Sequence, residues 1–241
     1  MKACLSHSTV PYGWSRYLDL IDHRYFYQLG KRGSYSCDIA RNAAAQQLDL
    51  FKADFADSNF LISLLYYIDN PSVTGFMIEQ AVLSSIGSTG LAINAQIGES
   101  MDVRPLMKEP NFATNVTEKP VLYRPIEFNY KAIDGMIVKA GKKNANGKKP
   151  KLCLFPIQIT VAKSHSDSHT KFFVEYNKWS RYLKDFDVEI QFLWINLKGG
   201  NTRQHRKTIQ WPAHQERYVP LKKVSQEIWM TYQMAKGDPM N

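Results

Sequence analysis

Cysteine is scarce in this chain and is never paired at short range. Cys4, Cys37 and Cys153 lie far apart, and no CxxC pair occurs. This spacing argues against a disulfide framework and against a structural zinc site. Cysteine usage of this kind is typical of a reducing compartment.

Long apolar runs are also absent. No run approaches the roughly 18 apolar residues of a membrane span, and residues 1–10 lack the basic start and apolar stretch of a signal peptide. There is no internal repeat, and the only low-complexity tract is a short lysine-rich stretch. The sequence therefore predicts neither a membrane partner nor a signal peptide within this chain.

What the chain does have is a substantial apolar fraction and an excess of positive charge. Its 241 residues are 44% hydrophobic and 12% aromatic, which is enough to bury a core. Lysine and arginine number 31 against 22 acidic residues, a net charge of +9. Such a surface favours polyanions, because neutralised phosphates release condensed counterions. The same charge also fits a basic protein that has no nucleic-acid partner.

Residue patterns predict a helical beginning followed by an α/β core. Helices are expected at residues 39–55, 59–68, 74–86, 170–183 and 221–235. Strands are expected at residues 121–130, 133–140, 152–161 and 188–197. This order indicates a mixed sheet flanked by helices, with residues 1–70 as a helical N-terminal segment packed on a core of residues 71–241.

Two acidic residues stand where apolar residues are expected. Glu79 shares a helix face with apolar neighbours such as Val82 and Leu83, and Asp134 interrupts the apolar run AIDGMIV. A carboxylate in apolar surroundings is unfavourable unless it is paired or binds a metal. Two plainer interpretations stay open: Glu79 at the edge of its stripe, reaching water, and a hairpin turn at the Asp-Gly pair.

The third predicted strand carries a polar pair. Its odd-numbered positions form an unbroken apolar face, so Gln158 and Thr160 point together to the other face. Lys163, His165 and His169 follow the strand, and a polar loop with solvated histidines explains them equally well. Their spacing does not indicate a zinc site.

Taken together, these residues match the needs of metal-dependent phosphodiester hydrolysis. A helix acid, a strand acid and a polar pair on the next strand offer oxygen ligands to Mg²⁺, which takes few protein carboxylates and keeps several waters. The metal would activate a water and stabilise charge on the phosphate, and a lysine or histidine would assist.

Three segments, GFMIEQAVLSSI, YKAIDGMIV and LFPIQITVAKSH, resemble in this order the three segments of the PD-(D/E)XK nuclease fold. They look most like the version at the C-terminus of Crinkler-type effectors of oomycetes and fungi and of retrotransposon-hot-spot proteins. The upstream segments DHRYFY, GSYSCDIARNAAAQQL and NFLISLLYYIDNPSVTGF look like the part that precedes the nuclease core there. The resemblance covers most of the chain and weakens after about Trp194.

The resemblance implies a restriction-endonuclease-like fold and a DNA endonuclease that uses Mg²⁺ or Mn²⁺. It implies Glu79, Asp134 and Gln158 as metal ligands, with Lys163 or His165 polarising the phosphate. General members carry an acid, and a lysine two residues later, where this chain has Gln158 and Thr160. Because a neutral amide binds a divalent cation more weakly than a carboxylate, the alternative is a degenerate module of the same fold that binds nucleic acid or a host protein.

The resemblance also implies where the protein would act. It points to a secreted effector domain working in a host nucleus, on DNA more than on RNA. Such proteins usually carry an N-terminal secretion and translocation module, so this chain would be a C-terminal part of a longer protein or a stand-alone relative. Nothing in the sequence indicates an oligomeric state.

Two basic clusters could contact phosphates, and solvated loops are the plainer interpretation of both. The first lies between two predicted strands and also fits a nuclear import signal. The second surrounds His205. Their members are Lys142, Lys143, Lys148, Lys149 and Lys151 in the first, and Arg203, Arg206 and Lys207 in the second.

Overall fold

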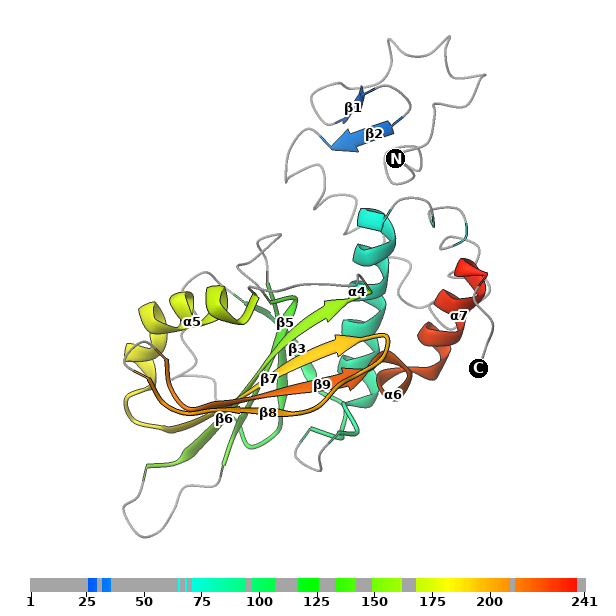
Figure 1. Cartoon of the computed structure of the whole chain (residues 1–241). Coiled ribbons are helices and arrows are strands. Elements are labelled where there is room, and N and C mark those ends of the chain that lie inside the picture. Colours follow the sequence, from blue (N-terminus) through cyan, green and yellow to red (C-terminus); the bar gives the residue numbers. More distant parts are fainter. Residues whose placement is uncertain are drawn as a thin grey trace. The chain divides into compact units, whose positions relative to one another are not determined.

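The strand-forming segments in the second half of the chain build one mixed sheet of seven strands (Figure 1). Its strands are β3 (Asp102–Leu106), β4 (Val121–Pro125), β5 (Gly135–Ala140), β6 (Lys151–Thr160), β7 (Asp187–Asn196), β8 (Arg203–His205) and β9 (His214–Pro220). Their order across the sheet is β3-β4-β5-β6-β7-β9-β8. All strands run in one direction except β5 and β8, which are antiparallel to their neighbours. The start of β5 therefore lies beside the end of β6, at the same end of the strands.

The helices are α4 (Pro71–Thr89), α5 (Ser168–Trp179), which continues into the 3₁₀ helix η3 (Ser180–Leu183), α6 (Leu221–Val224) and α7 (Gln226–Lys236). A separate antiparallel pair is formed by β1 (Phe26–Leu29) and β2 (Arg32–Tyr35). This computed structural model describes residues 26–29, 32–35, 65, 68, 71–93, 97–106, 117–125, 133–141, 149–161, 168–208 and 211–237. Among these residues, no helix is long and apolar enough to cross a membrane.

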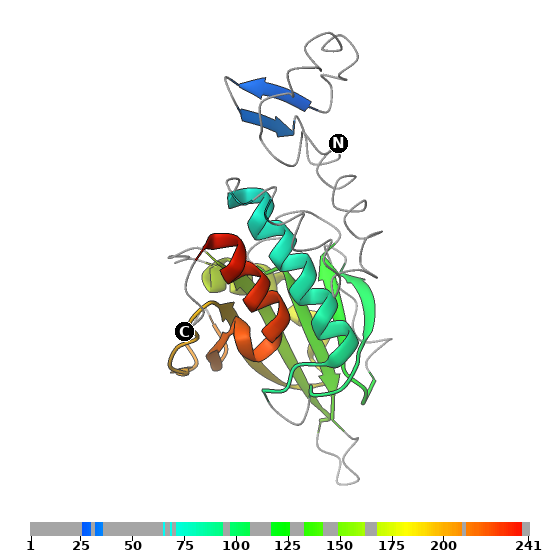
Figure 2. The same ribbon diagram turned by 90° about the vertical axis from the view of Figure 1, so that its right-hand side faces the viewer.

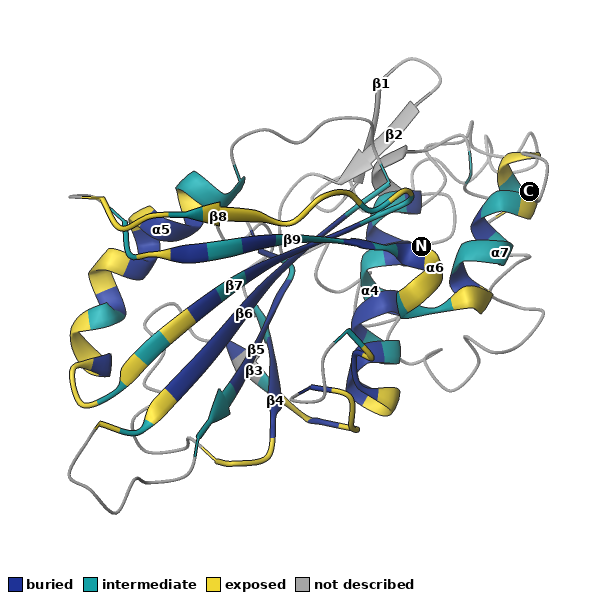
Figure 3. Cartoon of the chain, turned by 60° about the horizontal axis from the view of Figure 1, so that its bottom comes forward, coloured by how far each residue is buried: buried dark blue, intermediate teal, exposed yellow. Residues whose placement is uncertain are grey.

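Strand alternation gives the sheet two distinct faces. The face covered by α5, called here the α5 face, contributes residues such as Met136, Leu154 and Phe192 to one hydrophobic core. Phe172 and Tyr176 of α5 complete that core, and the helix lies along the sheet in Figure 1. Figure 3 shows the result, since the central strands β6 and β7 are buried along most of their length and exposed mainly at one end.

The opposite face, called here the α4 face, receives the second half of α4 (Figure 2). Gly135 makes this approach close, because a Cβ added there would stand 2.8 Å from Leu83 Cδ2. Gly135 opens β5, and the Asp134 N–H already donates to the Ile157 carbonyl at 2.8 Å. The Asp-Gly pair thus belongs to the β5–β6 ladder rather than to a two-residue hairpin turn.

The predicted α/β order is confirmed from α4 onward. The helix predicted at 74–86 extends by three residues at each end, and the apolar stripe of α5 is buried as expected. The predicted helix at 221–235 is divided at Ser225, whose backbone is extended (φ −150°, ψ 112°). Strand β4 spans Val121–Pro125, and the rest of the strand predicted at 121–130 lies outside the described residues.

Some elements were not predicted, and some predictions lie outside the described residues. Strands β1, β2, β3, β8 and β9 were missed, because they are short or rich in polar residues. The helix predicted at 39–55 lies outside the described residues, as does all of 59–68 except Leu65 and Ile68. The chain forms two compact units, Met1–Ala81 with Glu227–Asn241 and Val82–Gln226. The division at residue 70 into an N-terminal segment and a core stays a prediction.

Candidate functional site

Asp134 and Gln158 meet in the middle of the sheet, at the end of the strands where β5 starts and β6 ends. The antiparallel register pairs Gly135 with Ile157 and so brings the two polar side chains together. Gln158 Nε2 donates to Asp134 Oδ2 at 2.8 Å, and the backbone N–H of Ile159 donates to the same oxygen at 2.6 Å. The structure thus joins two of the site residues singled out in the sequence.

Burial dominates the electrostatics of this pair. Removal of the carboxylate from water raises the pKa of Asp134 to about 7, although the hydrogen bond from the Ile159 N–H opposes the rise. The Gln158 side chain contributes no charge, and the residue is only 8% exposed. A carboxylate held in this way is protonated in part at neutral pH, and a cation in contact with it would favour the ionised form.

The neighbouring strands extend this site along the α5 face. In register, Gln158 stands beside Trp194 of β7, which stands beside Tyr218 of β9. The two aromatic rings stack, with centroids 6.0 Å apart and planes 6° apart. Trp194 Nε1 is a buried donor with no hydrogen-bond partner in the part of the chain that the structure describes. Thr160, on the same face as Gln158, is partly exposed.

Glu79, the third predicted metal ligand, belongs to the other compact unit. Its neighbours Phe76, Val82 and Leu83 are at most 8% exposed, whereas Glu79 is partly exposed. This burial fits the edge-of-stripe interpretation. Lys163 and His165 lie outside the described residues.

The two basic clusters differ in how their charges are used. Lys149 Nζ donates to the Lys184 carbonyl, and Lys151 forms an exposed ion pair with Glu189. The guanidinium of Arg203 lies over the Tyr218 ring, 5.7 Å from its centroid. The rest of the second cluster, Arg206 and Lys207, is exposed. In the first cluster, residues 142–148 are outside the described part, including Lys142, Lys143 and Lys148.

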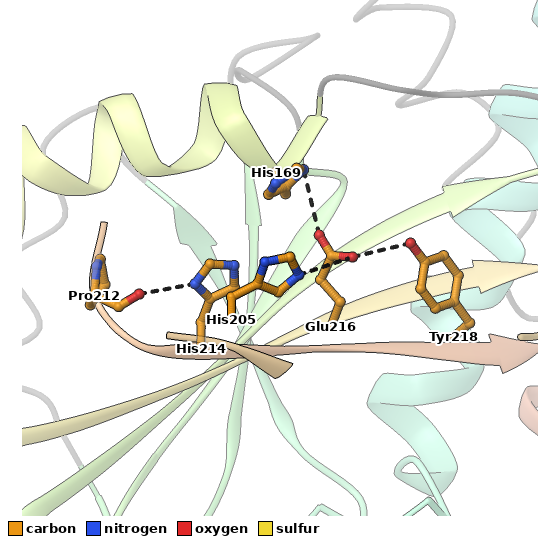
Figure 4. Close-up of polar contacts among 6 residues, drawn as sticks. All are labelled: His169, His205, Pro212, His214, Glu216 and Tyr218. Atoms are coloured by element: carbon orange, nitrogen blue, oxygen red, sulfur yellow. Dashed lines mark hydrogen bonds and ion pairs between the residues drawn. The ribbon is translucent and has the colours of Figure 1, made fainter. Parts of the chain in front are cut away.

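A second polar cluster on the α5 face was missed in the sequence (Figure 4). His214 and Glu216 are alternate residues of β9, His205 faces His214 from β8, and His169 comes from the first turn of α5. Glu216 Oε1 lies 3.5 Å from His169 Nδ1, and Oε2 lies 3.6 Å from His205 Nε2. The Tyr218 hydroxyl donates to Oε2 at 3.1 Å. We call the three histidines and Glu216 the histidine–glutamate cluster.

His214 is the most constrained histidine of this cluster. It is 4% exposed, and its Nδ1 lies 3.0 Å from the Pro212 carbonyl, so that nitrogen carries the proton and donates it. Burial lowers the pKa of His214, with the hydrogen bond to Pro212 opposing. Its other nitrogen, Nε2, is buried without a hydrogen-bond partner among the described residues, and so is Nε2 of His205. The rings of these two histidines stack with centroids 4.5 Å apart.

One sequence signal could have indicated this cluster. In a strand, the pattern His214-Gln215-Glu216 puts the histidine and the glutamate on one face. The segment was not predicted to be a strand, and the other histidines arrive from two separate elements. The sequence spacing of the histidines therefore gave no indication of a metal site, although three-dimensional proximity does.

The two polar sites are distinct. Two strand spacings of about 4.8 Å and two residues of about 3.3 Å separate the backbones of Gln158 and Glu216 by about 12 Å. The side chains are also engaged differently, since Gln158 contacts Asp134 whereas Glu216 contacts His169 and Tyr218. Comparisons of the chain with protein-family models, with curated proteins and with solved structures found no match.

Proposed function

We propose that this protein is a divalent-metal-dependent nucleic-acid phosphodiesterase, most specifically a DNA endonuclease. The contact between Asp134 and Gln158 carries the proposal, because two residues marked in the sequence for the same site are hydrogen-bonded in the fold. The mixed sheet flanked by helices is compatible with it, because the resemblance implies an α/β fold of this coarse class, although β3, between α4 and β4, was not predicted. Action in a host nucleus stays a prediction from that resemblance.

The oxygen atoms of this pair suit Mg²⁺ or Mn²⁺. The hydrogen bonds from Gln158 and Ile159 both go to Oδ2 of Asp134, which among the described residues leaves Oδ1 for a cation. A half-turn of the Gln158 amide would present Oε1 in place of Nε2. A bound cation of this class lowers the pKa of a coordinated water and stabilises charge on the phosphate. Glu79, Lys163 and His165 remain candidate participants from the sequence.

Other residues of the α5 face could hold the phosphodiester. Trp194 Nε1 is a buried donor that a phosphate oxygen could satisfy. Arg203 of β8 adds positive charge, and its guanidinium lies over the ring of Tyr218 in β9. A planar guanidinium suits phosphate geometry better than an ammonium group does.

A second candidate is a module that binds nucleic acid or a host protein without cleaving it. The direction of the Gln158 amide favours it, because Nε2 already satisfies Asp134 without any cation. The raised pKa of Asp134 favours it too, since the protonated form needs no counter-charge. The two candidates differ in what divalent cations do to a nucleic-acid substrate.

The test is nicking of supercoiled plasmid DNA, and of single-stranded RNA, with Mg²⁺ or Mn²⁺ and with EDTA. We expect cleavage by the natural protein to stop with EDTA and with Asp134→Ala, and to persist in Asp185→Ala, which alters an exposed aspartate in the turn before β7. Cleavage that survives both EDTA and Asp134→Ala would show that another site is responsible.

The double variant Gln158→Glu, Thr160→Lys distinguishes the two candidates. It adds a carboxylate ligand beside Asp134 and a cation on the same strand face. A working site would lose activity through crowding by the new lysine. A degenerate site would gain activity from none, and that gain, with no cleavage by the natural protein on DNA or RNA, would establish the second candidate.

A further inference from the structure

We propose that the histidine–glutamate cluster is a binding site for a transition-metal dication of the zinc class. His169, His214 and Glu216 would supply its ligands, from α5 and β9. This proposal does not depend on the nuclease proposal, because the cluster lies apart from Asp134 and uses different donor atoms. Imidazole nitrogens favour Zn²⁺ and similar ions over Mg²⁺, which prefers oxygen donors.

The spacing of the donor atoms supports a shared ion. One donor atom from each of His169, His214 and Glu216 lies within 4.8 Å of the others. Two ligands that bind tetrahedral zinc at about 2.0–2.1 Å are about 3.4 Å apart. Oε1 of Glu216 stands 3.5 Å from His169 Nδ1, close to that value. Small side-chain rotations would bring the widest pair to the same separation.

His214 is prepared as a ligand. Its Nδ1–H donates to the Pro212 carbonyl, so Nε2 carries the lone pair. Metal-binding histidines almost always donate their other N–H to a carbonyl or carboxylate, which fixes the ring and its tautomer. Nε2 is buried with no partner among the described residues, and Figure 4 shows it on the side of the ring toward His169 and His205.

Hydrogen bonding alone leaves the cluster poorly satisfied. Glu216 is 3% exposed, and among the described residues its carboxylate accepts one hydrogen bond, from the Tyr218 hydroxyl. Its distances of 3.5 and 3.6 Å to two imidazoles exceed those of strong charge-assisted hydrogen bonds. A buried carboxylate beside an unpartnered imidazole nitrogen is unfavourable unless a proton or a metal ion joins them. His205 lies against the other carboxylate oxygen and would position it.

Binding would link two elements. His169 stands at the start of α5, and His214 and Glu216 belong to β9. Zinc bound by these residues would therefore hold β9 against the start of α5 and stabilise the folded chain.

The experiment uses the full chain, freed of metal with a chelator and then titrated with Zn²⁺ in competition with a chromophoric chelator. We expect one zinc per chain. His169→Asn should lower the affinity by more than about 100-fold, because loss of a ligand should cost more than loss of a residue that only supports a ligand. His169→Cys should restore binding, because a thiolate also ligates zinc. Glu216→Gln should weaken it as His169→Asn does.

Two controls keep the result interpretable. Asp185→Asn removes an exposed carboxylate in the turn before β7, and Asp134→Ala removes the principal residue of the other site; both should bind zinc like the natural chain. Circular dichroism shows whether each variant is folded, and the partly exposed His169 (19%) is the substitution least disruptive to the core. Absence of zinc binding by the natural chain would overturn the proposal. So would zinc binding by folded His169→Asn and Glu216→Gln that is as tight as that of the natural chain. Plasmid cleavage that is lost in Asp134→Ala while zinc binding persists separates the two sites.

Discussion

Asp134 lowers the stability of the metal-free fold and is also a candidate metal ligand. Its Oδ2 accepts two hydrogen bonds, yet burial still raises its pKa to about 7. A carboxyl group that is hard to ionise is unfavourable for folding at neutral pH and poised for a cation. Gln158 adds a donor without adding a charge. The pair thus makes the metal-free protein less stable and leaves a carboxylate able to bind a cation.

Replacement of Asp134 by Asn should stabilise the metal-free protein above neutral pH. In the unfolded chain the carboxyl ionises near its ordinary pKa of 3.8, whereas in the folded chain it ionises near 7. Between these values the folded state binds more protons, so the free energy of unfolding of the natural protein falls as pH rises from about 4 to 7 and then levels. Asn keeps an oxygen that accepts both hydrogen bonds and does not titrate.

The measurement is urea unfolding of both proteins in EDTA, at acidic and at mildly alkaline pH. The gap in unfolding free energy should be small near pH 4 and a few kcal/mol above pH 7. Asp185→Asn, at an exposed position, should show no such trend. Parallel pH curves for natural and Asp134→Asn proteins would contradict this account.

At the scale of elements, α4 approaches the start of β5 closely. Leu83 of α4 occupies the space that a side chain at Gly135 would need. Asp134 directly precedes Gly135, so the packing of the helix affects the position of the carboxylate. Helix packing on the α4 face therefore affects a site whose Gln158 side chain lies on the α5 face.

Two glycine-to-alanine substitutions should have opposite effects. Gly135→Ala places a Cβ 2.8 Å from Leu83 Cδ2 in a buried setting, and should lower the free energy of unfolding by about 1–3 kcal/mol. Gly75→Ala in α4 meets nothing within 4 Å and should raise it by about 0.5–1 kcal/mol through reduced chain entropy. Chemical denaturation measures both. Equal effects of the two changes would argue that α4 does not press on β5.

At the scale of the whole molecule, the net charge of +9 is the main feature relevant to partners. The two basic clusters are not equivalent in the fold. Lys149 and Lys151 have protein partners that a phosphate must displace, whereas Arg206 and Lys207 are exposed just after β8. The second cluster is therefore the better candidate for phosphate contacts.

Salt dependence of DNA binding should separate the clusters. The logarithm of the binding constant falls with that of the salt concentration, by about 0.9 for each neutralised phosphate. Changing Arg203, Arg206 and Lys207 to Gln should flatten this slope more than changing Lys149 and Lys151 to Gln. Fluorescence anisotropy over a range of NaCl concentrations measures it. The reverse order, or unchanged slopes in both variants, would return Arg203, Arg206 and Lys207 to the role of solvated surface.

Local pattern in the sequence determined much of the fold. The stripe of α5 and the alternation of β6 each predict one buried face, and that face is buried in the structure. The same alternation placed Gln158 toward Asp134, and the two are in contact. These predictions succeed because side-chain direction in a helix or strand follows from its period alone.

Tertiary structure decided what depends on pairing between distant segments. The edge strand β8 is too short and too polar to have a pattern of its own, and β9 mixes charged and apolar residues. Only their pairing with each other and with β7, under α5, brings His169, His205, His214 and Glu216 together. Their contacts cross between elements, so no period along the chain encodes them. The close approach of Leu83 to Gly135 arises in the same way, because the space at a glycine is set by whichever element packs against it.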